Sequence, residues 1–204
     1  MTAMKNTYNL AAWILPQTLA VIFCLASAPA FADWRKGAGY MELADRLDRS
    51  QDGYCFDLPG AGEWVDTSAP VNAHNCKVPG FYPDGAVTFA SPGQIRFPAY
   101  GLCLTATGLN GRSLPGAALL VRHCADQAGQ SNSFLASESG LQIFVHRDDG
   151  RIELGRSGLC IAVGNRSDST YSSSHRWRPL FLAECKTINA GRSVWKPFQP
   201  KSDR

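Results

Sequence analysis

Cysteine is the residue type with the clearest chemistry in this 204-residue sequence. Six of the seven cysteines follow residue 32, and they are Cys55, Cys76, Cys103, Cys124, Cys160 and Cys185. Near neighbours among them are 21, 21 and 25 residues apart, and no C-x-x-C or H-x-x-x-H spacing suggests zinc. The even count and the spacing predict three disulfides, 55–76, 103–124 and 160–185. Each closed loop would contribute on the order of 3 kcal/mol to stability.

Motifs for catalysis are absent from the sequence. It has no G-x-S-x-G element and no glycine-rich phosphate loop, and the histidines are scattered as His74, His123, His146 and His175. Glycoside cleavage would require two carboxylates that approach one another, and the sequence leaves open whether Asp57 and Asp84 do so. We therefore expect a binding protein rather than an enzyme, with no metal and no cofactor.

The composition is that of a folded chain with many turns. Hydrophobic residues make up 45% and charged residues 18%. The net charge is +3, and the basic residues are not clustered in one run. A nucleic-acid partner would favour a clustered basic stripe, so we expect none. The 19 glycines and 12 prolines favour short strands over long helices.

The first 32 residues are typical of a secretory signal peptide. An apolar stretch from Leu10 to Leu25 precedes the small-residue site Ala30-Phe31-Ala32. Pro16 interrupts the apolar stretch, which argues against a membrane anchor. We expect cleavage near Ala32, a secreted or periplasmic protein, and no membrane span in the mature chain.

An internal repeat organises the rest of the chain. An aliphatic residue lies eight positions before the first cysteine of each pair and a glycine lies two before it, as in Leu47-Gly53-Cys55, Ile95-Gly101-Cys103 and Ile152-Gly158-Cys160. A large aromatic residue follows the second cysteine of each pair, at Phe89, Phe134 and Trp195, and we expect these three to fill the core. Each unit has room for about four short strands, so three units predict a closed all-β barrel capped by hairpins.

These repeats resemble those of the ricin-type (R-type) β-trefoil lectins. The resemblance rests on Arg151 to Ile161 and on Gly53 to Asp57, and it extends over residues 44–198. The Gln-x-Trp element that ends the family's repeats is degenerate here, as in Ser193-Val194-Trp195. The resemblance implies a β-trefoil of three repeats of about 50 residues, with residues 33–43 as an N-terminal extension and 199–204 as a tail.

The resemblance also implies a shallow sugar pocket in the first repeat. There Asp57, two residues after the first cysteine, would accept hydrogen bonds from sugar hydroxyls, and Asn72 would support it. His74 would provide the flat surface under the ring, with Trp64 as the other candidate platform. Asp84 or Tyr82 would take the place of the amide residue that the family uses. Charged acceptors for hydroxyls and a flat apolar surface for the C–H face are what a sugar requires.

The other two repeats lack the carboxylate, since Thr105 and Ala162 occupy its position. Two functions follow from this uneven pattern. The first is a secreted carbohydrate-binding protein that binds glycans weakly, with galactose-like sugars in the first repeat. The second is a sugar-blind β-trefoil that binds an exported protein partner, as a toxin delivery subunit or an inhibitor, through exposed Trp64, Tyr171 and Trp177.

Overall fold

The computed structural model describes residues 33–125 and 139–200, which contain short strands and three 3-10 turns but no α-helix. The first repeat holds β1 (Tyr40–Leu43), β2 (Tyr54–Asp57), η1 (Gly62–Trp64), β3 (Asn72–Asn75) and β4 (Thr88–Ala90). The second holds β5 (Gln94–Phe97), β6 (Leu102–Ala106), β7 (Leu119–His123), η2 (Ser139–Gln142) and β8 (Phe144–His146). The third holds β9 (Ile152–Leu154), β10 (Leu159–Val163), β11 (Asp168–Ser169), β12 (Arg176–Glu184), η3 (Ala190–Arg192) and β13 (Trp195–Phe198).

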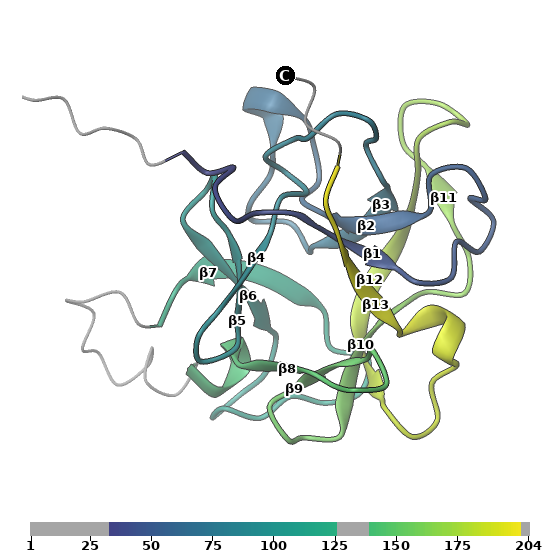
Figure 1. The fold of residues 1–204 in the computed structure, drawn as a ribbon. Coiled ribbons are helices and arrows are strands. Elements are labelled where there is room, and N and C mark those ends of the chain that lie inside the picture. The colour runs from purple at the N-terminus through teal and green to yellow at the C-terminus, as the bar shows by residue number, and fades with distance from the viewer. Residues whose placement is uncertain (1–32, 126–138, 201–204) are drawn as a thin grey trace, which may run out of the picture. The chain divides into compact units, whose positions relative to one another are not determined.

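Six strands close into a barrel, two from each repeat (Figure 1). The antiparallel pairs β13–β1, β4–β5 and β8–β9 join successive repeats. Three equivalent backbone hydrogen bonds of 2.8 Å connect these pairs, from Val87 to Gly39, from Phe144 to Gly93 and from Trp195 to Gly150. Closure leaves the barrel without free sheet edges.

Three hairpins, β2–β3, β6–β7 and β10–β12, form a cap on the barrel. Each carries one disulfide, and the three are Cys55–Cys76, Cys103–Cys124 and Cys160–Cys185, as the spacing predicts. The hairpins meet through the Val71 N–H bond to Leu119 (2.8 Å), the Gly116 N–H bond to Leu182 (2.7 Å) and the β3–β12 pairing. A barrel of two-strand pairs with three capping hairpins is a β-trefoil, so the expected fold is confirmed.

The aromatic side chains that fill the core are not all the expected ones. Trp195 is fully buried, but Phe89 is 42% exposed and Phe134 lies outside the described residues. The residues equivalent to Trp195 by backbone hydrogen bonding are Val87 and Phe144, and both are buried. The expectation for Phe89 was wrong because it took an aromatic residue as the marker of the core position, which in the first repeat is held by the aliphatic Val87.

The first repeat begins earlier than the cysteine spacing suggests. Residues 40–43, assigned above to an extension, form the barrel strand β1, in which Glu42 lies opposite Cys55. Leu47 does not belong to a strand, since it lies in a turn with a φ of 53°. The turn between β1 and β2 spans residues 44–53, whereas the equivalent turns span 98–101 and 155–158. This longer turn displaces β1 away from the first cysteine.

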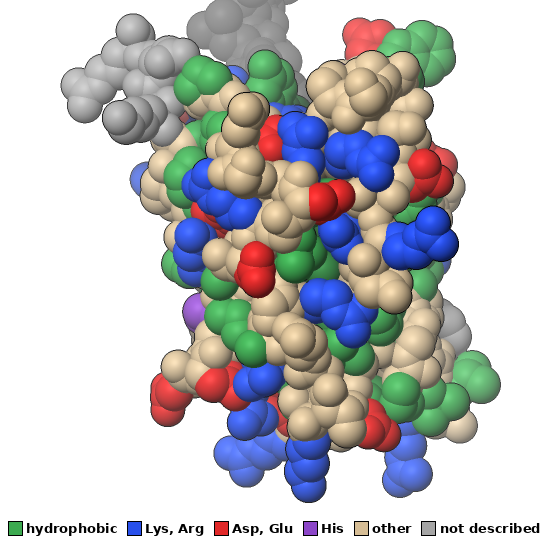
Figure 2. Space-filling model, turned by 90° about the vertical axis from the view of Figure 1, so that its right-hand side faces the viewer, with side chains coloured by type: hydrophobic (Ala, Val, Ile, Leu, Met, Phe, Trp, Pro, Cys, Tyr) green, Lys and Arg blue, Asp and Glu red, His purple; other side chains and the backbone are tan. Residues whose placement is uncertain are grey.

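Charges of both signs cover the surface. Figure 2 shows the side of the molecule that carries β11, where Lys and Arg side chains lie among Asp and Glu side chains rather than in one stripe. Within the described residues, no helix is long and apolar enough to cross a membrane. The expected signal peptide lies outside the described residues and stays a prediction.

Candidate functional site

Three of the first-repeat residues singled out above, Asp57, Asn72 and His74, lie on one face of the β2–β3–β12 sheet. In the register of these strands Asp57 is opposite Asn72, and Cys55 is opposite His74. Side chains alternate along a strand, so Asn72 and His74 share the outer face while Ala73, which is fully buried, faces the core. Strand pairing thus brings together residues that are 15 and more positions apart in the sequence.

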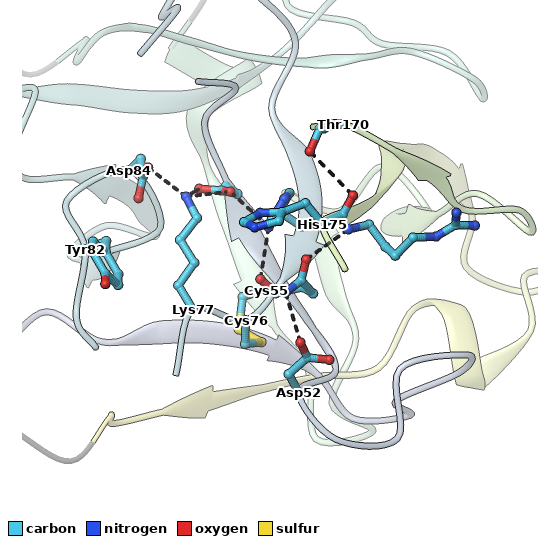
Figure 3. Close-up of polar contacts among 12 residues, drawn as sticks. Asp52, Cys55, Cys76, Lys77, Tyr82, Asp84, Thr170 and His175 are labelled. Atoms are coloured by element: carbon cyan, nitrogen blue, oxygen red, sulfur yellow. Dashed lines mark hydrogen bonds and ion pairs between the residues drawn. A yellow bond between two sulfur atoms is a disulfide. The ribbon is translucent and has the colours of Figure 1, made fainter. Parts of the chain in front are cut away.

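Lys77 binds two carboxylates at the centre of this face. Its Nζ donates to Asp57 Oδ1 at 2.9 Å and to Asp84 Oδ2 at 2.7 Å. Figure 3 shows the Lys77 side chain reaching Asp84 beside the Cys55–Cys76 disulfide. The loop that carries Asp84 is held against β2, because the Leu58 N–H donates to the Asp84 carbonyl at 3.0 Å.

Burial makes this cluster of charges sensitive to protons. Asp57 and Asp84 are both at least 95% buried, and with Lys77 charged the cluster carries one net negative charge. Burial raises the pKa of Asp57 to about 7; the charge of Lys77 opposes this shift and that of Asp84 adds to it. Burial alone would lower the pKa of Lys77, but the two carboxylates outweigh it and raise that pKa.

His74 flanks the cluster as a neutral side chain. Its Nδ1 lies 3.7 Å from Asp57 Oδ2 and 3.0 Å from the carbonyl oxygen of Asn75. Burial lowers the pKa of His74, the backbone contact with Asn75 opposes the shift, and the charge of Lys77 adds to it. A neutral ring offers a flat surface beside Asp57 and one nitrogen for hydrogen bonding.

The space beside Asp57 is nearly filled. The cavity lined by Asp57, His74 and Lys77 measures about 10 Å³, roughly the smallest volume that holds one water molecule. A ligand that reaches the Asp57 carboxylate must therefore displace the ammonium group of Lys77, whose side chain is 22% exposed.

Two buried side-chain oxygens of the described residues have no hydrogen-bond partner, Asn72 Oδ1 and Asp84 Oδ1. Both belong to residues selected from the sequence for sugar binding. Buried acceptors are normally paired, and an exception in a folded protein requires an explanation. Hydroxyl and N–H groups are the donors that such oxygens accept.

A second and much larger cavity opens on the other side of Asn72 and His74. We call it the β3–β12 groove: it lies between β3, the segment before β7 and the β11–β12 hairpin, and its volume is about 700 Å³. Tyr171 and Trp177 line it, and none of its lining residues carries a carboxylate, ammonium or guanidinium group. Trp64, the other candidate platform, is 85% exposed on η1 and lines neither cavity.

The equivalent positions of the second repeat hold a neutral network. Gln142 Nε2 donates to Thr105 Oγ1 at 3.0 Å and to the His123 carbonyl at 2.9 Å, and its Oε1 accepts from the Ala125 N–H at 2.9 Å. Gln142-Ile143-Phe144 is thus the Gln-x-aromatic element of this repeat, in place of the expected Asn132-Ser133-Phe134. The third repeat has only Ala162 and Ala183 at the matching positions.

Two residues at the centre of these hydrogen-bond networks, Lys77 and Gln142, were not selected from the sequence. Lys77 directly follows the second cysteine of the one repeat that keeps the carboxylate, and this adjacency was a usable signal. Gln142 matches the Gln-x-aromatic pattern, but it lies farther from its cysteine than the pattern in the third repeat. Among the described residues, no group of three His, Cys, Asp or Glu side chains is arranged to hold a metal ion.

Known structures share this fold. No family model and no curated protein matches the chain. The agglutinin from Abrus precatorius matches with a TM-score of 0.53 and 19% identity, over 81% of this chain and 49% of its own, so this chain spans about half of the agglutinin chain. The mdaA-1 domain matches with a TM-score of 0.54 and 13% identity, over 81% of this chain and 91% of its own. The designed threefold symmetric protein ThreeFoil matches with a TM-score of 0.50 and 14% identity, over 80% and 99%.

Proposed function

We propose that this protein is an exported carbohydrate-binding β-trefoil that binds a galactose-like sugar weakly through its first repeat. The observation that carries this proposal is the buried carboxylate pair Asp57 and Asp84, in which Asp84 Oδ1 has no hydrogen-bond partner. Sugar hydroxyls are donors and acceptors at once, so they suit a site that presents carboxylate and amide oxygens. The fold shared with an agglutinin agrees with this function, and the three disulfides agree with export.

The mechanism of binding is an exchange of donors at Asp57. In the free protein the Lys77 ammonium satisfies Asp57 and one oxygen of Asp84. When a sugar binds, its hydroxyls donate to Asp57 and Asp84 as the Lys77 side chain moves toward solvent. The flat ring of His74 then contacts the C–H face of the sugar, and the Asn72 amide supports the pocket. Losing the Lys77 ion pairs opposes binding, which is the physical reason to expect low affinity at a single site.

A glycan-array screen of the oxidised protein, displayed multivalently, tests the proposal, because valency compensates for weak single sites. We expect selective retention of galactose-like glycans that Asp57→Ala abolishes. Thr105→Ala, which changes the equivalent position of the second repeat, is the matched control and should keep retention. Circular dichroism and thermal unfolding of each variant establish that it is folded.

Two results would contradict this assignment. Unchanged retention by folded Asp57→Ala would mean that the sugar binds elsewhere. No retention by the folded wild-type protein would reject sugar binding and favour the second function.

That second function is a sugar-blind β-trefoil that binds an exported protein. Its support is the closed cavity at Asp57, where Lys77 already occupies the carboxylates. Trp64 and Tyr171 are 85% and 80% exposed and would serve as anchors in such an interface. It predicts that a defined exported protein co-purifies from native extract and that Trp64→Ala weakens the complex.

A further inference from the structure

The β3–β12 groove begins where the proposed sugar site ends. Asn72 and His74 line it on one side, and the register places Trp177 opposite His74 and Pro179 opposite Asn72 on the neighbouring strand. The outer face of the sheet therefore runs without interruption from Asp57 across β3 to Trp177. A ligand held at Asp57 that is longer than one ring would extend into this groove.

The far wall of the groove is a feature of the third repeat alone. Strand β12 (Arg176–Glu184) is longer than its counterparts β3 and β7, and its first residues pair with both β3 and β11. The Arg176 N–H donates to Asn75 Oδ1 at 3.0 Å, which fastens this extension to the first repeat. The extension carries Tyr171 and Trp177 to the groove.

The base of the extension is held by a charged network. Arg178 Nη2 donates to Asp48 Oδ1 at 2.7 Å, and Tyr54 donates to the same oxygen at 2.8 Å. Burial alone would raise the pKa of Asp48, but the hydrogen bonds from Arg178, Ser167 and Tyr54 outweigh it and hold that pKa well below its usual range. The groove wall is thus fixed in place before any ligand binds, which limits the entropic cost of binding.

The lining chemistry selects the kind of occupant. The volume of about 700 Å³ falls among pockets that enclose drug-sized ligands, roughly 300–1,000 Å³, and a single hexose fills only part of it. The absence of ionic lining groups disfavours phosphorylated, sulfated or acidic ligands, whose charges would lose water without gaining a partner. Aromatic walls suit the apolar faces of sugar rings, and the unpartnered Asn72 Oδ1 suits a hydroxyl.

We infer that the β3–β12 groove binds the second ring of an uncharged oligosaccharide, with Trp177 and Tyr171 as its stacking surfaces and Asn72 as its hydrogen-bond partner. This inference rests on the proposed function, because the first ring must be held at Asp57. It makes the protein selective for chains of two or more neutral rings over single sugars. The first repeat supplies the polar end of the site and the third repeat supplies its aromatic end.

Titration calorimetry on the full protein tests this extension. The ligands are a methyl glycoside of the sugar selected on the array and a neutral disaccharide that ends in the same sugar. We expect the disaccharide to bind about tenfold more tightly than the methyl glycoside, because its second ring stacks on the aromatic side chains of the groove. Trp177→Ala should remove that gain while leaving the affinity for the methyl glycoside unchanged.

Tyr171→Ala is the second variant, because its side chain is 80% exposed and its removal should not disturb folding. We expect Tyr171→Ala to lose part of the additional affinity for the disaccharide. Trp64→Ala, which removes an equally exposed aromatic side chain outside the groove, is the control and should bind both ligands as the wild type does.

The possible failures are distinguishable. If the wild type binds the two ligands equally, or if folded Trp177→Ala and Tyr171→Ala keep the full gain, the inference is wrong although the proposed function stands. If neither ligand binds, the proposed function fails and the inference fails with it. An apolar peptide that shifts the NMR signals of Gly116, Thr170 and Tyr171, where the disaccharide does not, would assign the groove to a protein partner instead.

Discussion

The first and second repeats place different chemistry at the same point of the same fold. In the first repeat Asp57 and Asp84 are buried around Lys77, and two oxygens remain unpartnered. In the second repeat, Gln142 joins Thr105, His123 and Ala125 through neutral hydrogen bonds at the equivalent place.

The difference shows that the trefoil does not need charges at this point. In the second repeat, neutral hydrogen bonds from Gln142 satisfy polar groups of the hairpin. The third repeat has alanine at two matching positions. Burying two carboxylates around a partly buried ammonium group is costly, and an apolar or neutral replacement is often as stable. A costly cluster in one repeat out of three supports the proposal that this repeat binds a ligand, since perturbed ionisable groups concentrate at functional sites.

Among substitutions that test this difference between the two repeats, Lys77→Met is expected to change the free energy of unfolding most. The substitution leaves Asp57 and Asp84 buried without their cation, so we expect a loss of about 3–5 kcal/mol in the free energy of unfolding near pH 8. Urea unfolding measures it. Lys186→Met is the matched control, because Lys186 also follows the second cysteine of its repeat but is exposed; it should change stability by less than about 0.5 kcal/mol. Equal losses for the two variants would show that the first repeat does not depend on its charges.

A smaller effect is expected from Asp57→Asn, and it should depend on pH. The folded protein raises the pKa of Asp57 to about 7, so the carboxyl group stabilises the fold at low pH and this contribution is lost as pH rises through about 7. The stability of Asp57→Asn relative to the wild type should therefore increase from pH 4 to pH 8, by a few kcal/mol at about 1.4 kcal/mol per pKa unit.

Urea unfolding at several pH values provides this comparison for Asp57→Asn. The exposed Asp148→Asn serves as its control and should show little change with pH relative to the wild type. A relative stability of Asp57→Asn that stays constant or decreases toward pH 8 would mean that Lys77 keeps Asp57 ionised throughout.

The smallest effect is expected from Gln142→Ala in the second repeat. It removes three hydrogen bonds and leaves the Ala125 N–H without its partner, while the buried Thr105 hydroxyl keeps only its bond to the Cys103 carbonyl, for a loss of about 1–3 kcal/mol. Thermal unfolding at pH 5 and pH 8 should give the same loss, because no ionised group takes part. Gln51→Ala, at an exposed glutamine, is the control. A loss that varies strongly with pH would show that the second repeat is not a neutral counterpart of the first.

Prediction from the sequence succeeded where the signal was local. The cysteine spacing alone paired all six cysteines correctly, because each disulfide lies within one hairpin. The position two residues after Cys55 drew attention to Asp57, which lies in the buried cluster with Lys77; its role in sugar binding stays a prediction. The prediction failed at Phe89, because the aliphatic Val87 holds that core position. The offset from the first cysteine that places Ile95 and Ile152 in strands places Leu47 in a turn, because the turn before Cys55 is longer.

The sequence by itself determined the number of repeats, their disulfides, the all-β class and the carboxylate position Asp57 of the first repeat. These follow from spacings within one hairpin, which the chain carries explicitly. Only the tertiary structure decided that the Lys77 ammonium group binds the carboxylates of Asp57 and Asp84. It also decided that Trp177 of the third repeat lies opposite His74 of the first. Both facts depend on strand pairing and burial between segments far apart in the chain. Burial then sets the charge state of Asp57, because the cost of ionising a carboxyl group depends on everything packed around it.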